Sequence, residues 1–511
     1  MIVISPSSVH PRGHPRARVV RRLTAVVISG TAAVATLALV APPASATGDP
    51  ALASKLSSVM RDPRVQRASS GAVVLDAKDG SQLYGRYSAR ALTPASNTKI
   101  LTAATALHVL GPGYRFKTEV IRRSSLTSDG VLHGRLYLKG YGDPTTRQAD
   151  FAALARQVRS YGIRRVTDEL IVDSTFFDSV RYSPNWSTVY ASDYYAAQIS
   201  ALTVAPNADL DSGTMIIRYA PGSRGKPAKI TTSPAAARSY VKIVNKTTTS
   251  ARGTSTTFWA HRAYGTNTIT VNGRVPQGRA TGSWQITVDK PELYAAAVFR
   301  AELAKVGVTI ARGTELQRIP DKDHHLVAVD RSMPLSQLLV PFLKLSNNMH
   351  AEALTKTMGT LKGHRGNWAD GLSYTKAYLK STGALMTGVV LVDGSGLTRR
   401  NKLSARALGR FLYKIQRETW WPVFDNALPV AGDTTRMVGG TLRHRMNATP
   451  AANNAHAKTG TLTGVTALSG YVTGADGRRY VFAMLSNYTQ ATPRPVENTF
   501  VIALAGWRRS A

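Results

Sequence analysis

Short apolar runs that predict strands lie at both ends of the chain. Residues 71–75 (GAVVL) form one such run, and SQLYGRY follows it after an Asp79-Gly80 pair that favours a tight turn. Near the other end, GVTALSGYVTGADGRRYVFAMLS contains two runs around Asp476-Gly477, and a closing helix is expected after them. We therefore expect the two ends of the chain to share one sheet, with other material inserted between them.

The spacing of apolar positions changes several times between these ends. From about Thr118, the stretch KTEVIRRSSLTSDGVLHGRLYLKGYGDPT alternates as strands do. Residues 206–284 are rich in Thr, Gly, Ser and Arg with short alternating runs, which predicts a small, mostly β module. Helical spacing is evident in DKPELYAAAVFRAELAKVGVTI and over residues 335–357.

A helix is also predicted in TPASNTKILTAATAL, which begins at Thr93. Thr93 suits the N-cap and Pro94 the first helical position, so Ser96 is expected in the first turn. The single charge of this stretch is Lys99, three residues after Ser96. The apolar positions that recur at helical spacing are Ile100, Leu101, Ala104 and Leu107.

Ser96 and Lys99 have the chemistry of a nucleophile and its base. Residues i and i+3 share a helix face, so Lys99 can reach the Ser96 hydroxyl. Burial lowers the pKa of a lysine, which then can accept a proton from the serine. The Ser-x-x-Lys spacing also occurs at Ser239 and at Ser373. Ser239 lies in a predicted strand, which would point the pair to opposite faces, and Ser373 lies in a helix that is expected to be solvated.

The N-terminus has the layout of a secretory signal peptide. Five arginines precede an apolar stretch over residues 23–40, and Ala44-Ser45-Ala46 supplies a small-residue cleavage site. We therefore assign residues 1–46 to a signal peptide and expect a secreted, cell-wall-associated protein. A membrane anchor that is not cleaved is the alternative. The 511 residues allow two to four domains and a large core.

The amino-acid composition indicates which binding partners are favoured and which side-chain chemistry is excluded. The formal net charge is +35, and about +30 remains after removal of residues 1–46. In a secreted protein this charge favours anionic cell-wall polymers or phospholipid surfaces over nucleic acid; the alternative is a solvated cationic surface without a partner. The chain has no cysteine, which excludes disulfides and thiolate chemistry. No cofactor or metal is implied, and the His324-His325 pair and His456 are expected at the surface.

Two further stretches carry chemistry that complements Ser96 and Lys99. In KLSNNMHAEAL, Ser346 can relay a proton, and the amide of Asn348 can donate to and accept from a peptide substrate. In HAKTGTLTG, Lys458, Thr459 and Thr461 can hold a carboxylate through charge-assisted hydrogen bonds. Gly460 has no side chain, so a substrate could lie against its strand.

Together these stretches match the Ser-x-x-Lys, Ser-x-Asn and Lys-Thr-Gly motif set. With GAVVLDAKDGSQLY, YLKGYGDPT, AQISALTV, DGSGLTRRN, LPVAG and GGTLRHRM, the chain resembles class C low-molecular-weight penicillin-binding proteins, the D-alanyl-D-alanine carboxypeptidase/endopeptidases, over roughly residues 50–508. Ser96 and Ser346 are 250 positions apart, and a long insertion between the first two motifs is the class C feature.

The resemblance implies an α/β (α+β) fold, a β-lactamase/transpeptidase-like domain whose antiparallel sheet is flanked by helices and which two smaller inserted domains interrupt. The expected boundaries are 47–117 and 326–511 for the catalytic domain, 118–205 and 285–325 for inserted domain II, and 206–284 for inserted domain III.

The resemblance also implies a role for each site residue. Ser96 is the acylated nucleophile and Lys99 its base, and Ser346 and Asn348 complete the cleft. Lys458, Thr459 and Thr461 hold the C-terminal carboxylate of the substrate, and the backbone amides of Ser96 and Thr461 form the oxyanion hole. Arg399 and Tyr195 belong to a pocket for the stem-peptide side chain. An acid is expected in that pocket, where this chain has Tyr190, with Asp193 close by.

The predicted function is a serine D-alanyl-D-alanine carboxypeptidase/endopeptidase that cleaves peptidoglycan stem peptides through an acyl-enzyme and is acylated by β-lactam antibiotics. Two alternatives remain from the sequence. One is a β-lactamase or esterase on the same fold, and the other is a non-catalytic wall-binding protein that uses its positive charge. No nucleotide fingerprint, Gly-x-Ser-x-Gly or His-Glu-x-x-His motif is present.

Overall fold

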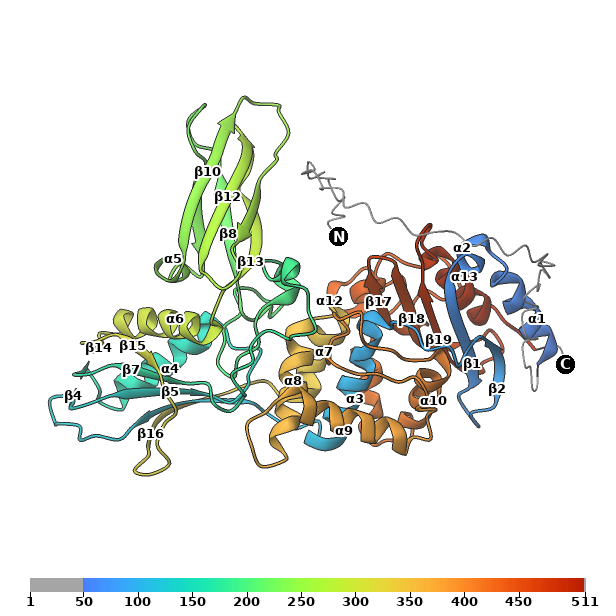
Figure 1. Ribbon diagram of the computed structural model, residues 1–511, viewed down its shortest axis with the longest axis horizontal. Coiled ribbons are helices and arrows are strands. Elements are labelled where there is room, and N and C mark those ends of the chain that lie inside the picture. The colour runs from blue at the N-terminus through green and yellow to red at the C-terminus, as the bar shows by residue number, and fades with distance from the viewer. Residues whose placement is uncertain (1–48, 510–511) are drawn as a thin grey trace, which may run out of the picture. The chain divides into compact units, whose positions relative to one another are not determined.

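Strands from opposite ends of the sequence form one antiparallel sheet. The computed structural model describes residues 49–509. The sheet has the order β17-β18-β19-β1-β2 (Figure 1). β1 pairs with β19 from Ser69↔Asn487 to Asp76↔Tyr480, so the expected shared sheet is confirmed. Its strands are β1 (Ser69–Asp76), β2 (Gln82–Arg86), β17 (His456–Leu462), β18 (Val465–Thr473) and β19 (Arg479–Asn487).

Both faces of this sheet are covered, because its strands are apolar on both sides. Ala72 and Val74 face a core built with α1 (Pro50–Val59) and α13 (Arg494–Ala505). Val73 and Leu75 point to the opposite face and join the larger core beneath the remaining helices. The short helix α2 (Pro63–Gln66) leads into β1.

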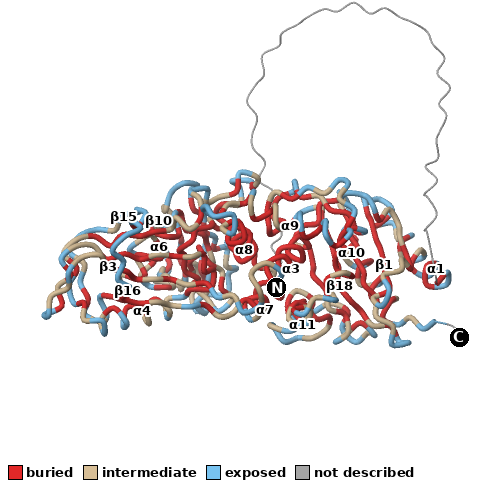
Figure 2. The backbone as a smooth tube through the Cα atoms, turned by 90° about the horizontal axis from the view of Figure 1, so that it is seen from below, coloured by how far each residue is buried: buried red, intermediate tan, exposed pale blue. Residues whose placement is uncertain are grey.

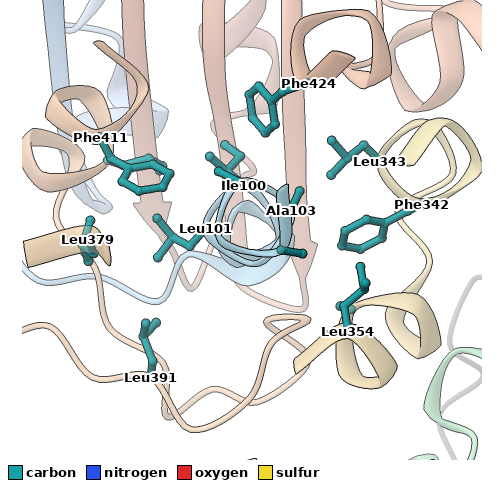
Figure 3. Packing of buried hydrophobic residues seen from close by; sticks show 14 of the residues in the cluster. Ile100, Leu101, Ala103, Phe342, Leu343, Leu354, Leu379, Leu391, Phe411 and Phe424 are labelled. Atoms are coloured by element: carbon teal, nitrogen blue, oxygen red, sulfur yellow. The ribbon is translucent and has the colours of Figure 1, made fainter. Parts of the chain in front are cut away.

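The helix α3 (Thr98–Leu110) lies at the centre of the larger core and is buried along ten consecutive residues. Figure 3 shows apolar side chains around it, among them Phe342, Leu354 and Phe411. Figure 2 shows the same helix as buried chain. The surrounding helices are α7 (Leu335–Lys344), α8 (Asn348–Thr360), α9 (Trp368–Ser381), α10 (Ala405–Ile415) and α11 (Trp421–Ala427). The helical region predicted over residues 335–357 is therefore two helices with a break between them.

The first inserted part is a mixed sheet with two helices. Its order is β15-β7-β5-β3-β16, and a small sheet of order β14-β6-β4 accompanies it. β16 pairs with β3, so the chain returns beside the strand through which it left the catalytic core. The elements are β3 (Lys117–Arg122), β4 (Val131–Leu132), β5 (Leu136–Gly140), α4 (Gln148–Ser160), β6 (Arg165–Val166), β7 (Leu170–Asp173), α6 (Pro291–Lys305), β14 (Thr309–Ile310), β15 (Thr314–Leu316) and β16 (His325–Arg331).

The second inserted part, here called the β module, contains two three-stranded sheets (Figure 1). Their orders are β10-β12-β11 and β13-β8-β9, and buried Ile217 and Val271 from the two sheets belong to one core. Ser239 lies in a one-turn helix before β10, not in the strand that we expected. The elements are β8 (Thr214–Ala220), β9 (Lys229–Ser233), α5 (Ala237–Tyr240), β10 (Lys242–Ser250), β11 (Trp259–Arg262), β12 (Thr268–Pro276) and β13 (Gly282–Thr287).

The boundaries of the three domains expected from the sequence remain a prediction. The sheets follow it within a few residues, although β13 crosses the boundary expected at residue 284 and β16 pairs with the insert beyond residue 325. The described residues all belong to one compact unit. Within residues 49–509, no helix has the length and apolar character needed to cross a bilayer. The predicted signal peptide lies outside the described residues.

Candidate active site

Ser96 lies in a tight turn that precedes α3. The turn is the 3-10 helix η1 (Ala95–Asn97), and α3 begins only at Thr98. Thr93 is not the N-cap that we predicted: its amide donates to Asn487 Oδ1 at 3.0 Å and its hydroxyl to the Arg399 carbonyl at 3.3 Å. The turn that carries Ser96 is therefore fastened to β19 and to the loop before α10.

The turn is strained at the residue before the nucleophile. Ala95 has φ +47°, a conformation that costs a non-glycine residue ~1–3 kcal/mol. The hydroxyl of Thr98 donates to its carbonyl at 2.9 Å. A Cβ at Gly396 would lie 1.8 Å from the same carbonyl oxygen, so only glycine lets the loop 393–401 pack here. This loop holds the turn in the conformation that exposes Ser96 to Lys99.

The Nζ of Lys99 is surrounded by three oxygen atoms. They are Ser96 Oγ at 2.9 Å, Asn348 Oδ1 at 2.6 Å and the Ser395 carbonyl at 2.7 Å. Asn348 Oδ1 and the carbonyl can only accept, so they occupy the two N–H groups of a neutral amine. The lone pair of that amine then faces the Ser96 hydroxyl, which is the geometry a general base needs.

Burial makes the neutral form of Lys99 accessible. The side chain is fully buried, and burial lowers its pKa to about 7. The charges of Glu352 and Asp393 oppose this effect. Glu352 accepts from the amides of Gly394 and Ser395 at 2.9 and 2.8 Å, so it also fixes the loop whose carbonyl contacts Lys99. The pKa of Glu352 is raised to about 7, first by burial and then by Asp393.

The break between α7 and α8 presents the second motif. Ser346 has φ +62°, and Asn347 caps α8 by accepting from the amides of Met349 and His350 at 2.9 and 3.2 Å. Asn348 is the first residue of α8. Its Nδ2 donates to the Tyr195 carbonyl at 2.8 Å, which leaves Oδ1 for Lys99.

The third motif lies on the edge strand β17. The Nζ of Lys458 is buried and donates to Ser346 Oγ at 2.9 Å. Burial holds the pKa of Lys458 well below its ordinary value, because a charged amine is poorly solvated there. The charge of Lys99 lowers this pKa further, because two neighbouring cations repel each other. A Cβ at Gly460 would lie 2.7 Å from the Pro94 carbonyl oxygen. Gly460 thus allows β17 to approach the nucleophile turn, and the substrate contact that we expected at Gly460 stays a prediction.

The surroundings of the predicted substrate-binding residues differ from one residue to the next. The hydroxyl of Thr459 donates to Thr441 Oγ1 at 2.8 Å, whereas Thr461 is exposed. Arg399 is exposed and donates to the Thr463 carbonyl at 2.5 Å. Tyr195 contributes its backbone carbonyl to Asn348, and its hydroxyl donates to Asp193 Oδ2 at 2.8 Å.

The structure adds residues that the sequence interpretation missed. Glu352 follows Asn348 by four positions on α8, and this i, i+4 spacing was the available signal. Ser395 lies inside DGSGLTRRN, a stretch from which we assigned only Arg399. Arg494 begins α13 and donates to Thr461 Oγ1 at 3.3 Å, a contact for which we find no signal in the sequence.

The Ser-x-x-Lys copies at Ser239 and Ser373 lack this environment. The hydroxyls of Ser239 and Ser373 donate to the carbonyls three residues before them, at 2.8 and 2.6 Å. Within residues 49–509, no group of three or more His, Asp or Glu side chains could hold a metal ion. Ser96 is therefore the nucleophile candidate that the geometry supports.

Comparisons with known proteins show the family to which the chain belongs. The model of the D-Ala-D-Ala carboxypeptidase 3 (S13) family matches residues 52–508. A D-alanyl-D-alanine carboxypeptidase from an Actinomadura species is 38% identical over 453 residues, which cover 88% of this chain and 84% of the relative.

The crystal structure of penicillin binding protein 4 from Haemophilus influenzae has a TM-score of 0.75 at 22% identity, covering 88% of this chain and 98% of that chain. A complex of the same protein with a β-lactam has a TM-score of 0.70. The likeness confirms the predicted fold class. By sequence and by motif, the chain belongs to the D-Ala-D-Ala carboxypeptidase 3 (S13) family, the class of serine peptidase that its motifs resemble.

Proposed function

We propose that this protein is a serine D-alanyl-D-alanine carboxypeptidase/endopeptidase that cleaves peptidoglycan stem peptides through an acyl-enzyme on Ser96. The observation that carries this proposal is the 2.9 Å hydrogen bond between Lys99 and Ser96, made by a buried lysine whose pKa is about 7. A lysine of that pKa is half neutral at neutral pH and can take the proton of the serine as it attacks.

The contacts support a sequence of proton transfers. Ser96 Oγ attacks the carbonyl carbon of the scissile bond and gives its proton to Lys99. The backbone amides of Ser96 and Thr461 are our candidates for stabilising the oxyanion. The C–N bond then breaks, and the proton that Lys99 received passes to the leaving amine through Ser346, whose hydroxyl accepts from Lys458 at 2.9 Å. Lys99, neutral again, can accept a proton from the water that hydrolyses the ester and frees Ser96.

The end of β17 is our candidate site for the C-terminal carboxylate of the substrate. Thr461 Oγ1 accepts from Arg494, so its own proton is free to point to a carboxylate oxygen. The guanidinium of Arg494 adds a positive charge next to this hydroxyl. A carboxylate close to Lys458 would also favour the charged form of that lysine. Arg399 and Tyr195 remain candidates for contact with the stem-peptide side chain, with Asp193 beside Tyr195.

We further propose that the protein acts outside the cytoplasm after cleavage near Ala46, and that β-lactams acylate it as substrate analogues. The arginine-rich start, apolar stretch and Ala44-Ser45-Ala46 support the first point. The β-lactam complex of the H. influenzae protein supports the second.

Product analysis on a pentapeptide that ends in D-Ala-D-Ala, run beside a penicillin, tests this function. We expect release of free D-Ala and a slowly hydrolysed penicillin adduct that peptide mapping places on Ser96. Ser96→Ala should lose both activities and keep its thermal midpoint. Fast penicillin turnover without D-Ala release would indicate a β-lactamase, and absence of both reactions in the folded protein would indicate a binding protein.

A further inference from the structure

The β module carries an excess of unpaired positive charge. Residues 212–288 contain eleven Lys and Arg and no Asp or Glu. Ten of the eleven are exposed, and none of the ten forms an ion pair within the described part of the chain. These ten are Arg218, Arg224, Lys226, Lys229, Arg238, Lys242, Lys246, Arg252, Arg274 and Arg279. Cationic side chains that repel one another destabilise the folded protein when no anionic group lies nearby. An anion from outside the chain would relieve this repulsion.

Part of this charge lies on the outer face of one sheet. On β10, Lys242 and Lys246 are both exposed, and they are four residues apart, so they share a face. The register places Lys246 beside Asn272 of β12, and Asn272 beside Trp259 of β11. Arg274 lies two residues further along β12 and points to the same side. The opposite face carries Ile269 and Val271, which are buried in the core of the module.

We call the outer surface formed by Lys242, Lys246, Arg274, Trp259 and His261 the cationic face. A strand rises ~3.3 Å per residue, so Lys242 and Lys246 are about 13 Å apart along β10. Arg274 pairs with Thr248 and therefore extends the row by two more positions. The cations thus follow the strands over about 20 Å, which suits an extended polymer with repeated anionic groups better than a single small anion.

The neutral residues of this face indicate the chemistry of the polymer. Trp259 is 43% exposed beside Asn272, which separates it from Lys246, and the flat indole offers a surface for the apolar C–H face of a sugar ring. The remaining outward positions are mainly hydroxyl and amide side chains, which bind sugar and phosphate oxygens. One exposed tryptophan is too little apolar surface for insertion into a bilayer, and it provides no row of stacking platforms for bases.

The cationic face is linked to the chain segment beside the active site. Arg262, the buried inner neighbour of His261 on β11, donates from its backbone to Ser192 Oγ at 2.9 Å and from its guanidinium to the Ala191 carbonyl at 2.7 Å. Three residues further along, the Tyr195 carbonyl holds Asn348. A polymer on this face would therefore lie along the sheet that supports one wall of the cleft.

We propose that the cationic face binds an anionic cell-wall polymer with phosphate groups repeated along sugar or polyol units, and so holds the enzyme on the matrix that contains its substrate. The choice of a wall polymer rests on the proposed function and location. The charge, the register and the exposed indole stand independently of both.

The test is co-sedimentation of the mature protein with purified cell walls that retain their phosphate polymers, and with the same walls after acid extraction of phosphate. The variant Lys242→Gln/Lys246→Gln/Arg274→Gln should bind intact walls at least about tenfold more weakly at ~0.15 M salt, and the slope of log affinity against log salt should fall by about two. Extracted walls should bind the unaltered protein as weakly as intact walls bind the variant.

The matched control is Lys78→Gln/Lys376→Gln/Lys380→Gln. It removes the same net charge from three exposed lysines outside the β module that form no ion pair in the described residues, and it should bind like the unaltered protein. Trp259→Ala should weaken binding without changing the salt slope. All variants should release D-Ala from a soluble pentapeptide at the unaltered rate, so that a failure of wall binding is distinguishable from a failure of the proposed activity.

Equal losses in the two triple variants would overturn the proposal, because net charge alone would then explain binding. Unchanged binding to extracted walls would overturn it as well. Binding to vesicles of phosphatidylglycerol and phosphatidylcholine that matches binding to walls would assign the face to a lipid surface instead.

Discussion

The pH dependence of Ser96 acylation is the sharpest test of the role of Lys99. A lysine with its ordinary pKa of 10.5 is neutral in only about 3 of 10,000 molecules at pH 7, whereas a pKa of about 7 makes half of the molecules neutral. This increase is on the order of 1,500-fold, equivalent to roughly 5 kcal/mol between the two protonation states. Because only the neutral amine accepts a proton, acylation should rise with pH through about 7 and then level off.

The assay is the second-order rate of acylation by a fluorescent penicillin, followed from pH 5 to 9 with the thermal midpoint as a control for folding. Between pH 6 and pH 8 the neutral fraction of Lys99 rises about tenfold, and the rate should follow it. The variant Lys99→Arg should be acylated at least about a thousandfold more slowly. Arginine preserves the positive charge, but its guanidinium does not lose its proton and therefore cannot act as the base.

Two results would refute this reasoning. A rate that is flat from pH 5 to 8, or that begins to rise only above pH 9, would show that burial does not set the base near neutrality. A folded Lys99→Arg enzyme with near-normal acylation would show that Lys99 acts through its charge and that the base lies elsewhere.

Three further substitutions test the third motif and its surroundings. Lys458→Ala should lower kcat/KM about 10- to 100-fold more for a peptide with a free C-terminal carboxylate than for its amide, which paired kinetics on the two peptides would measure, and equal losses would favour proton transfer alone. Arg494→Ala should cost the acid roughly 3- to 10-fold and the amide nothing, since its partly exposed guanidinium is screened by solvent; a loss on both peptides would indicate a structural role. Gly460→Ala should place a methyl group 2.7 Å from the Pro94 carbonyl, with about 1–3 kcal/mol lost in denaturant unfolding and slower acylation, whereas an unchanged enzyme would mean that β17 can move away at no cost.

Local sequence patterns predicted those helices and strands whose conformation is determined by residues close to them in the sequence. The apolar run at 71–75 and the hairpin at Asp476-Gly477 are strands of one sheet, because their apolar side chains need burial on both faces. The spacing in TPASNTKILTAATAL predicted α3 and the contact between Ser96 and Lys99. The error at Thr93 arose because capping propensity is local, whereas the start of α3 is set by tertiary contacts.

Those contacts come from residues about 300 positions away. Ala95 adopts φ +47° where the loop at Gly396 packs against its carbonyl, and no pattern around residue 95 contains that information. The break between α7 and α8 also depends on a distant residue. Ser346 has a positive φ there, and its hydroxyl accepts a hydrogen bond from Lys458. Sequence motifs therefore identified which residues meet, while the strained geometry through which they meet depends on the whole fold.

The surroundings of Lys99 show why the sequence predicted that its pKa is lowered but not how far. Burial alone lowers the pKa of an isolated lysine, and a pKa far below neutrality would make it a weak acceptor of the serine proton. Glu352 and Asp393 oppose burial, and each is held by backbone amides and an indole N–H rather than by a direct ion pair with Lys99. The carboxylates thus act on Lys99 through their charges at a distance, and Glu352 also holds the loop whose Ser395 carbonyl contacts Lys99. Their partial opposition leaves the pKa of the base near the pH at which proton transfer in both directions is feasible, and that balance depends on burial, which no spacing of residues encodes.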